Sequence, residues 1–213
     1  MPRLRPDTQR ARREKILDAA LTCFSRGGFH ATTMQSICRE AGISPGSLYV
    51  YFNSKEALIE GLCERDRAEF AERFAVLANA PDLLEALSAI GEHYFIDESP
   101  ERQRFAMEMG VEATRNPRIA DIFMKVDKYC SESFEALFQR MKDEKRIAPT
   151  IDIPRLAKVL SVLGDGLFWR RAIEPNVDMR AILPVMIQMI GSLLNPVERA
   201  PRSQSAKTHE ARV

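Results

Sequence analysis

The sequence has few of the residues that build enzyme active sites and metal centres. It contains three histidines in 213 residues, and none stands near a serine, cysteine or carboxylate in a recognisable nucleophile motif. It also lacks a glycine-rich phosphate loop and any His, Cys or Asp cluster with metal-ligand spacing. The four cysteines form no CxxC pair, which argues against a zinc site or a disulfide framework and suits reduced thiols. We therefore expect a protein that is not an enzyme and holds neither a metal nor a cofactor.

Long apolar runs are also missing. No stretch approaches the roughly 18 to 20 apolar residues that span a bilayer, and no apolar segment follows the basic N-terminus as it would in a secretory signal. Hydrophobic residues make up 45% and charged residues 29% of the chain, which excludes collagen-like and wholly disordered sequences. These features predict a soluble cytoplasmic protein of one large or two small domains, with no membrane partner.

The net charge of +1 hides an uneven distribution. Residues 1–60 hold nine Lys or Arg against six Asp or Glu, a net charge of +3, whereas residues 61–213 carry a net charge of −2. The first fifteen positions alone contain Arg3, Arg5, Arg10, Arg12, Arg13 and Lys15. A basic section on a mildly acidic chain indicates contact with a polyanion, although a solvated, frayed terminus would have the same composition.

Apolar residues recur every three or four positions along most of the chain, and the alternation typical of half-buried strands is absent. This spacing predicts an all-α fold of about nine helices. The stripe from Ile16 to Phe24 stops at Gly27-Gly28, a natural helix end. Pro117 opens a pattern of about 25 residues, long enough for a scaffold helix.

The C-terminal third is predicted to be helical as well. Asp165-Gly166 has the composition of a hairpin turn, but apolar residues step through it at helical spacing and favour one helix over 153–173. A last helix over 178–194 begins at Asp178 as its cap and contains Pro184, where a kink is expected. Residues 196–213 are polar and aperiodic, which predicts a disordered tail.

Two short helices, about 33–41 and 45–52, are predicted within the segment 29–58. Gly42 suits the left-handed conformation that ends the first helix, and Ser44 caps the second. Pro45 fits the first helical position, where no N–H is needed. Thr32 and Gln35 have capping-box spacing at the start of the first helix, with Thr33 as an alternative cap. These features together predict a helix-turn-helix, whose second helix enters the major groove of DNA.

The exposed side of the second short helix supports this interpretation, because a solvated face would normally carry Lys and Glu. It consists instead of Gly46, Ser47, Tyr49, Val50 and Tyr51. Hydroxyl groups donate to phosphate oxygens, and small residues let a helix lie deep in a groove. Lys55 lies at the start of the next helix, where the helix dipole disfavours a cation. A phosphate bound between the lysine and the helix end would make this position favourable. Paired short helices also occur in proteins that never touch DNA, so the uncharged face and Lys55 are what favour a DNA-binding function.

The stretch ATTMQSICREAGISPGSLYVYFNSKEAL resembles the helix-turn-helix signature of the TetR family of bacterial transcriptional regulators. The Ala-Gly-Ile-Ser turn, Leu48-Tyr49, Tyr51-Phe52 and Lys55 fall at that family's spacing, and the resemblance covers residues 8–60. It implies a three-helix DNA-binding domain followed by a larger helical domain that senses a ligand and dimerises through its last two helices. The implied divisions are a basic arm at 1–7, the DNA-binding domain at 8–54, the sensing and dimerisation domain at 55–195 and the tail at 196–213.

Carried over by position, the resemblance implies a set of DNA contacts. Phosphates would be met by Thr33, Ser47, Tyr49, Tyr51 and Lys55, base edges by Gln35, Pro45 and Gly46, and Ser44 completes the set. Gln35 is the one long polar group among those facing base edges, and a bidentate contact to adenine suits glutamine. Many relatives have Lys or Thr where this chain has Pro45 and Gly46, so direct readout is thin. The N-terminal arginines would then track phosphates or enter a minor groove.

The larger half is rich in Phe and Met, which at helical spacing usually form a core. A ligand cavity also needs polar groups among apolar ones. The candidate lining is Phe70, His93, Tyr94, Phe105, Glu108, Met109, Glu112, Phe123, Asp165, Phe168 and Trp169. Its carboxylates need partners, which are either arginines of the same chain or a ligand.

The last two predicted helices are apolar over more than one face, which favours a four-helix interface between two copies of the chain. The surplus apolar residues are Leu160, Leu163, Met186, Ile187, Ile190 and Leu194. Symmetry would then place two recognition helices about one turn of DNA apart on a palindromic operator. The same residues would be equally apolar if these helices were central in a monomer.

These expectations favour a ligand-responsive transcriptional regulator that binds double-stranded DNA as a homodimer, most simply a repressor released by a small-molecule inducer. The alternatives are a DNA-binding regulator controlled by a protein partner or by no ligand, and an activator that uses the same contacts.

Overall fold

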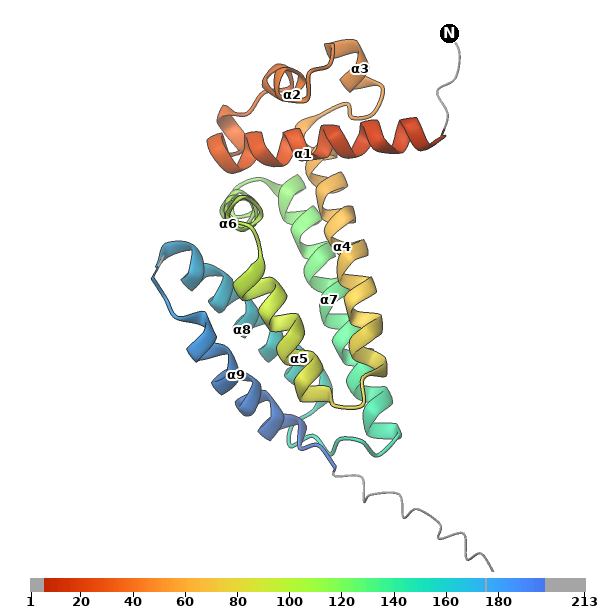
Figure 1. Cartoon of the computed structure of the whole chain (residues 1–213), viewed down its shortest axis with the longest axis vertical. Coiled ribbons are helices and arrows are strands. Elements are labelled where there is room, and N and C mark those ends of the chain that lie inside the picture. The colour runs from red at the N-terminus through yellow and green to blue at the C-terminus, as the bar shows by residue number, and fades with distance from the viewer. Residues whose placement is uncertain (1–5, 175, 198–213) are drawn as a thin grey trace, which may run out of the picture.

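The computed structural model of the chain describes residues 6–174 and 176–197, which form nine α-helices and one π-helical turn with no β-strand among them (Figure 1). This confirms the all-α class. The elements are α1 (Pro6–Ala31), α2 (Met34–Ala41), α3 (Pro45–Tyr49), α4 (Lys55–Asn79), α5 (Leu83–Glu92), the π-turn η1 (His93–Asp97), α6 (Pro100–Ala113), α7 (Pro117–Asp143), α8 (Ile153–Ile173) and α9 (Met179–Leu194).

Polar caps and prolines set most helix starts. Ser99, Asn116 and Asp152 accept hydrogen bonds from the first backbone N–H groups of α6, α7 and α8, and each of these helices has proline in its first turn. Asp178 caps α9 as predicted, accepting from the Ala181 N–H at 3.1 Å. The Asp165-Gly166 pair lies inside α8, as its helical spacing predicts.

The regular geometry of α1 is interrupted at Gly28, with φ 70° and ψ 179°, which agrees with the helix end predicted at Gly27-Gly28. The expected cap of the next helix needs correction. The cap of α2 is Thr33, in a reciprocal box with Ser36, because the Thr32 hydroxyl is buried and donates to the Cys23 carbonyl at 3.0 Å. Further along the chain, α5 changes at His93 into the π-turn.

Figure 1 shows α1 lying across one end of a larger bundle, with α2 and α3 on its outer side. α4 leaves α3 and runs down the bundle beside α7, while α5 packs on α9 and α6 packs under α1. α4 therefore extends from the helix-turn-helix deep into the larger part of the molecule.

Two hydrophobic cores support this arrangement. The first joins Phe24 of α1, Ile37 of α2 and Leu48 of α3 to Phe105 of α6 and Ile119 of α7. The second is built around Phe138, Met141 and Leu156, with α5 and α9 packed on them. Because α6 and α7 contribute to the first core, the helix-turn-helix rests on the larger domain, and the boundary predicted at residue 54 is crossed by continuous packing.

The chain ends differ in part from the expected arm and tail. α1 begins at Pro6, so Arg10, Arg12 and Arg13 lie on a helix, while Arg3 and Arg5 are outside the described residues. Arg13 pairs with Glu64 at 3.0 Å. At the other end, Pro196 and Val197 are not free: the Val197 N–H donates to the Arg146 carbonyl at 2.9 Å, and the predicted tail lies outside the described residues from position 198.

Candidate nucleic-acid interface and effector cavity

α2 and α3 form a compact helix-turn-helix on the end of the molecule (Figure 1). Gly42 has φ 62°, the left-handed conformation expected for the turn. The Ser44 hydroxyl accepts from the Ser47 N–H at 3.3 Å and so caps α3. Ile37, Ala41 and Leu48 are buried between the helices and α1, which turns the opposite faces of α2 and α3 outward.

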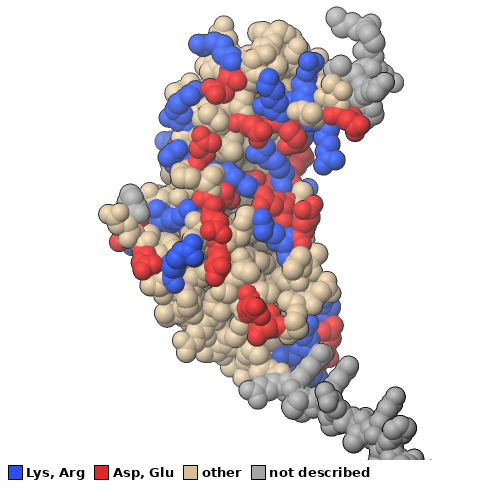
Figure 2. Space-filling view, viewed as in Figure 1, with Lys and Arg blue, Asp and Glu red and all other residues tan. Residues whose placement is uncertain are grey.

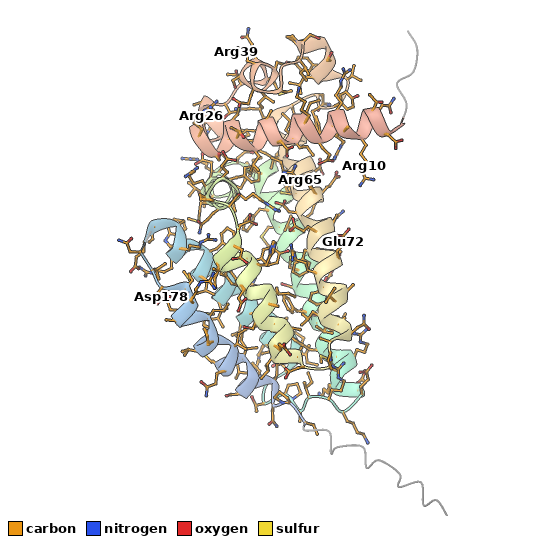
Figure 3. All side chains as sticks on the ribbon, viewed as in Figure 1. Arg10, Arg26, Arg39, Arg65, Glu72 and Asp178 are labelled. Atoms are coloured by element: carbon orange, nitrogen blue, oxygen red, sulfur yellow. The ribbon has the colours of Figure 1, made fainter. Side chains whose placement is uncertain are left out.

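The residues predicted to meet DNA lie on this outward face. Thr33, Gln35, Ser44, Pro45, Gly46 and Tyr49 are exposed, and Ser47 and Tyr51 are partly exposed. Sequence reasoning omitted two neighbours from the site. Val50 is 79% exposed and offers methyl groups to a groove. Arg39, at the end of α2, projects from the same end of the molecule (Figure 3). Its place as a basic residue in the last turn of the first short helix is the sequence feature that could have identified it.

Lys55 occupies an unexpected position at the start of α4. Its ammonium donates to the Phe29 carbonyl and lies 4.0 Å from the centroid of the Phe29 ring. Burial lowers the pKa of this lysine, while the nearby carboxylates Glu56 and Glu112 oppose the shift. An ammonium has three N–H donors, so the bond to Phe29 leaves donors for a phosphate.

The end of α1 is attached to α6 by a group of polar contacts, here called the junction cluster: Phe29, His30, Glu108, Glu112 and Arg115. Glu108 accepts from the Phe29 backbone N–H at 3.1 Å. The buried Glu112 carboxylate lies 3.0 Å from the His30 Nε2 atom and accepts a hydrogen bond from the Arg115 Nε atom at 3.0 Å. Burial alone would raise the pKa of Glu112, but the hydrogen bonds from Arg115 and Asn116 outweigh it and lower that pKa. The cluster joins the DNA-binding helices to the larger domain.

Several predicted cavity residues therefore serve this junction instead. Glu108 and Glu112 point toward α1, and Phe105 and Met109 are buried in the first hydrophobic core. Their shared helical face was identified correctly, but the neighbour of that face is α1 and not the cavity. None of the four lines the cavity.

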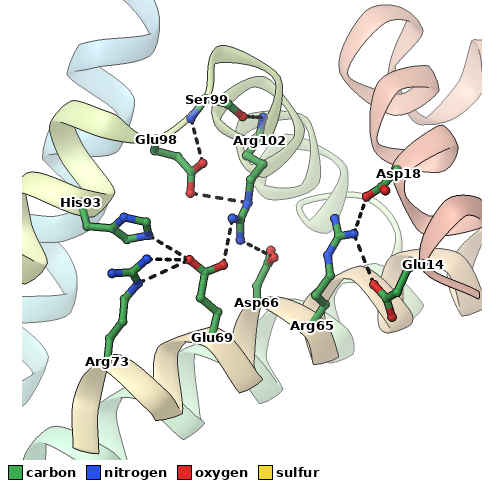
Figure 4. A network of polar contacts seen from close by, with 10 residues as sticks. All are labelled: Glu14, Asp18, Arg65, Asp66, Glu69, Arg73, His93, Glu98, Ser99 and Arg102. Carbon is green, nitrogen blue, oxygen red and sulfur yellow. Dashed lines mark hydrogen bonds and ion pairs between the residues drawn. The ribbon is translucent and has the colours of Figure 1, made fainter. Parts of the chain in front are cut away.

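A second polar group connects α4 with α6 and η1 (Figure 4). Arg102 contacts Asp66 at 2.6 Å and Glu69 at 2.9 Å, both on α4, and Glu98 at 3.5 Å. His93, another predicted cavity residue, is bound to Glu69 at 3.0 Å and does not line the cavity. Burial would raise the pKa of Glu69, but its hydrogen bonds from Arg102, Arg73 and His93 lower it. We call these residues the α4–α6 network.

The larger domain contains a cavity of about 600 Å³, a size typical of small-molecule sites. Six of the predicted residues line it: Phe70, Tyr94, Phe123, Asp165, Phe168 and Trp169. The lining is largely apolar, with a few polar groups such as Asp127, Cys130 and Ser161. The Tyr94 hydroxyl is buried and has no hydrogen-bond partner among the described residues.

The residues predicted to form a dimer interface lie inside the protomer. Leu160, Leu163, Met186, Ile187 and Ile190 line the cavity, and Leu194 is buried in the second core. A different set faces outward, and we call it the α8–α9 stripe: Val159, Val162, Gly166, Trp169 and Ile173 on α8, with Val185 and Met189 on α9. The α8 members alternate by three and four positions and so share one face of that helix.

The stripe is strongly exposed for an apolar surface. Val162 is 59% exposed and Val185 is 64% exposed. A Cβ added at Gly166 would meet no atom within 4 Å, so nothing in the protomer covers this part of α8. Figure 2 shows that the surface over α5 and α9 carries few charged side chains, whereas both signs of charge are dense nearer α1. Exposed branched and aromatic side chains of this kind mark an interaction site.

Within residues 6–174 and 176–197, no helix is long and apolar enough to cross a membrane. The same residues contain no cluster of three or more His, Cys, Asp or Glu side chains that would hold a metal ion.

Comparison with known proteins agrees with this architecture. Residues 16–62 match the family model "Bacterial regulatory proteins, tetR family", and residues 83–194 match "BetI-type transcriptional repressor, C-terminal". The chain is 30% identical over 189 residues to the HTH-type transcriptional regulator UidR of Escherichia coli K12, covering 85% of this chain and 92% of that protein. It is 29% identical over 198 residues to the HTH-type transcriptional repressor KstR of Mycolicibacterium smegmatis, covering 89% and 92%.

Solved structures show the same fold. Salmonella enterica GusR superposes with a TM-score of 0.76 at 27% identity, covering 86% of this chain and 95% of that one. The SmeT–triclosan complex superposes with a TM-score of 0.74 at 21% identity, covering 90% and 99%.

Proposed function

Because the chain belongs to the TetR family of bacterial transcriptional regulators, we propose that it is a repressor that leaves its operator when a small molecule enters the cavity. DNA-binding transcriptional regulation is the family's activity and is the function of this chain. Repression, release by a ligand and a cytoplasmic location are the proposal.

The observation that carries the proposal is the course of α4. The helix starts at Lys55, beside the helix-turn-helix, and reaches Phe70 in the wall of the cavity. The α4–α6 network and the junction cluster fasten α4 and α1 to α6, which itself contributes Met107 to the cavity wall. A ligand that moves α4 or α6 therefore moves the DNA-binding helices with them. By linkage, DNA must weaken the binding of that ligand by the same factor.

The proposed DNA-binding unit is a homodimer. The α8–α9 stripe offers the partner a surface of branched and aromatic side chains, and Gly166 allows a close helix approach at its centre. Two-fold symmetry would space the recognition helices by one turn of DNA or a multiple of it, so the operator is a palindrome.

The contacts proposed for each half-site follow the outward face of α2 and α3. Thr33, Ser47, Tyr49, Tyr51 and Lys55 would bind phosphates, while Gln35, with Pro45 and Gly46, would face base edges. Val50 and Arg39 are added to this set because of their exposure.

Two relatives support the finer parts of the proposal. KstR is a repressor by name, and SmeT, which shares the fold, holds triclosan in its solved structure.

The decisive experiment is selection of random duplex DNA on the purified protein in about 0.15 M salt, followed by sequencing. A palindromic consensus is expected, and the Gln35→Ala variant should recover the same palindrome with relaxed preference at one base pair in each half. Recovery of no consensus, even after denaturation and refolding have stripped any bound ligand, would overturn the proposal.

A further inference from the structure

The ionisable side chains that line the cavity are all acids. They are Asp127, Asp165, Cys130 and Tyr94, and no Lys, Arg or His occurs among the described lining residues. Burial, together with Asp127 and Asp165, raises the pKa of the Cys130 thiol to about 11. Burial also raises the pKa of the Tyr94 hydroxyl above its ordinary value, so both groups stay uncharged at neutral pH. The charge of the cavity is therefore set by the two aspartates.

Only one of these aspartates forms an ion pair. Lys158 donates to Asp127 at 3.2 Å and neutralises it from the outer side of α8. Asp165 makes no hydrogen bond or ion pair with any side chain in the described part of the protein. Burial and the nearby Asp127 raise the pKa of Asp165, and Lys158 opposes this rise without pairing with Asp165. The cavity wall thus carries one carboxylate that has no ion-pair partner among the described residues.

The rest of the wall strengthens the effect of that carboxylate. Its surface is built largely from aliphatic side chains and from the rings of Phe70, Tyr94, Phe123, Phe168 and Trp169. Asp165 is itself exposed, so water screens part of its attraction, and the faces of the aromatic rings add a further attraction for cations. A carboxylate or phosphate ligand would meet Asp165 with no basic side chain of the wall to pair with, which is costly.

We infer that the cavity selects a lipophilic amine: a ligand with an apolar body and one protonated nitrogen that pairs with Asp165, in preference to a neutral or acidic molecule of the same shape. This inference rests on the proposed function, because it names the class of ligand that would occupy the effector cavity. The buried Tyr94 hydroxyl, which has no partner in the described protein, is available for one further hydrogen bond to such a ligand.

The test uses three probes with one biphenyl body: 4-phenylbenzylamine, 4-phenylbenzyl alcohol and 4-phenylbenzoic acid. At neutral pH they are a cation, a neutral molecule and an anion. Calorimetric titration of the full chain gives their affinities, and quenching of Trp169, the one tryptophan of the sequence, reports occupation of the cavity. We expect the amine to bind about tenfold more tightly than the alcohol, and the acid to bind most weakly.

Two variants assign the effect to its source. Asp165→Asn keeps the side-chain shape and removes the charge, so the amine and the alcohol should bind with equal affinity. Asp121→Asn removes a carboxylate from the exposed side of α7, outside the cavity, and should keep the preference for the amine.

Every other result contradicts the inference. Equal affinity for the three probes, tighter binding of the acid, a preference that survives in Asp165→Asn, or no binding of the amine would each overturn it. A separate measurement of operator affinity keeps the two claims distinct. If the amine binds as expected and the operator is still held, the ligand class stands and the proposed release fails. If the alcohol or the acid releases the operator, the release stands and the ligand class fails.

Discussion

Replacement of Gly28 by alanine tests whether the junction between α1 and α6 depends on this one residue. Gly28 has φ 70° and ψ 179°, a region of backbone conformation that is essentially restricted to glycine. A Cβ at this position would lie 2.5 Å from Glu108 Oε1 and 3.0 Å from Glu108 Cδ. The Glu108 carboxylate would have to move away, and it is the acceptor of the Phe29 N–H.

The expected loss of stability follows from these two effects. The unfavourable backbone conformation costs about 1 to 3 kcal/mol for a residue with a side chain. Loss of the hydrogen bond to a half-buried carboxylate costs about 1 to 2 kcal/mol more. We therefore expect Gly28→Ala to lower the free energy of unfolding by about 2 to 5 kcal/mol.

The assay is reversible denaturant unfolding, with Gly27→Ala as the matched control. Gly27 is helical, and an added Cβ would lie 3.7 Å from both Ala31 and Thr32, which is ordinary contact. Because alanine is the better helix former, Gly27→Ala should be neutral or stabilising by about 0.5 to 1 kcal/mol. Adding Glu108→Ala to Gly28→Ala removes the steric contact but not the backbone strain, so the alanine at 28 should then cost only about 1 to 3 kcal/mol. If Gly27→Ala and Gly28→Ala unfold alike, the reasoning is refuted.

Three further variants test the junction cluster, the DNA contact and the dimer. The pKa of Glu112 is lowered in the folded state, so its contribution to stability should be complete above the ordinary value of 4.5 and lost as the pH falls through the lowered value. The Tm difference between the wild type and Glu112→Gln should therefore shrink as the pH falls through this range. A Tm difference that does not change with pH would contradict this. Lys55→Ala should weaken binding to all DNA sequences and reduce the salt slope by about one, whereas an unchanged slope would mean that the ammonium serves only Phe29. Val162→Glu should yield monomers in sedimentation equilibrium, while Val76→Glu, at an exposed position on α4 that lies off the stripe, should leave the oligomeric state unchanged; a dimeric Val162→Glu would exclude the stripe as the interface.

The sequence predicts well those features that depend on neighbouring residues. Asp178 caps α9, and the Gly42-Ile43-Ser44 turn has the predicted geometry, because caps and turns are satisfied within a few positions. The choice between Thr32 and Thr33 as a cap was beyond local reasoning. Both threonines fit, and the decision rests on the Cys23 carbonyl, nine residues earlier, which binds the Thr32 hydroxyl.

The lining of the cavity was harder to predict, because helical periodicity shows which residues share one side of a helix but not which other helix packs against that side. Glu108 and Glu112 do lie on one side of α6, but that side meets α1. Phe70, Phe123 and Phe168 were placed correctly because large rings in three long helices of the same bundle tend to meet at its centre. His93 contacts Glu69 on α4 and does not line the cavity, and no local sequence pattern indicates this partner on another helix.

α8 explains why the dimer residues were misassigned and what that means for function. The helix is apolar on two sides, so its sequence cannot distinguish the side that faces the cavity from the side that faces a partner. The structure separates them: Leu160 and Leu163 face the cavity, while Val162 and Gly166 face outward. Trp169 belongs to both sides, since it lines the cavity and is 49% exposed on the stripe. In the proposed dimer a ligand would therefore contact the same helix that sets the separation of the two protomers. Ligand binding then reaches the operator by two routes, through α4 within one protomer and through α8 between protomers.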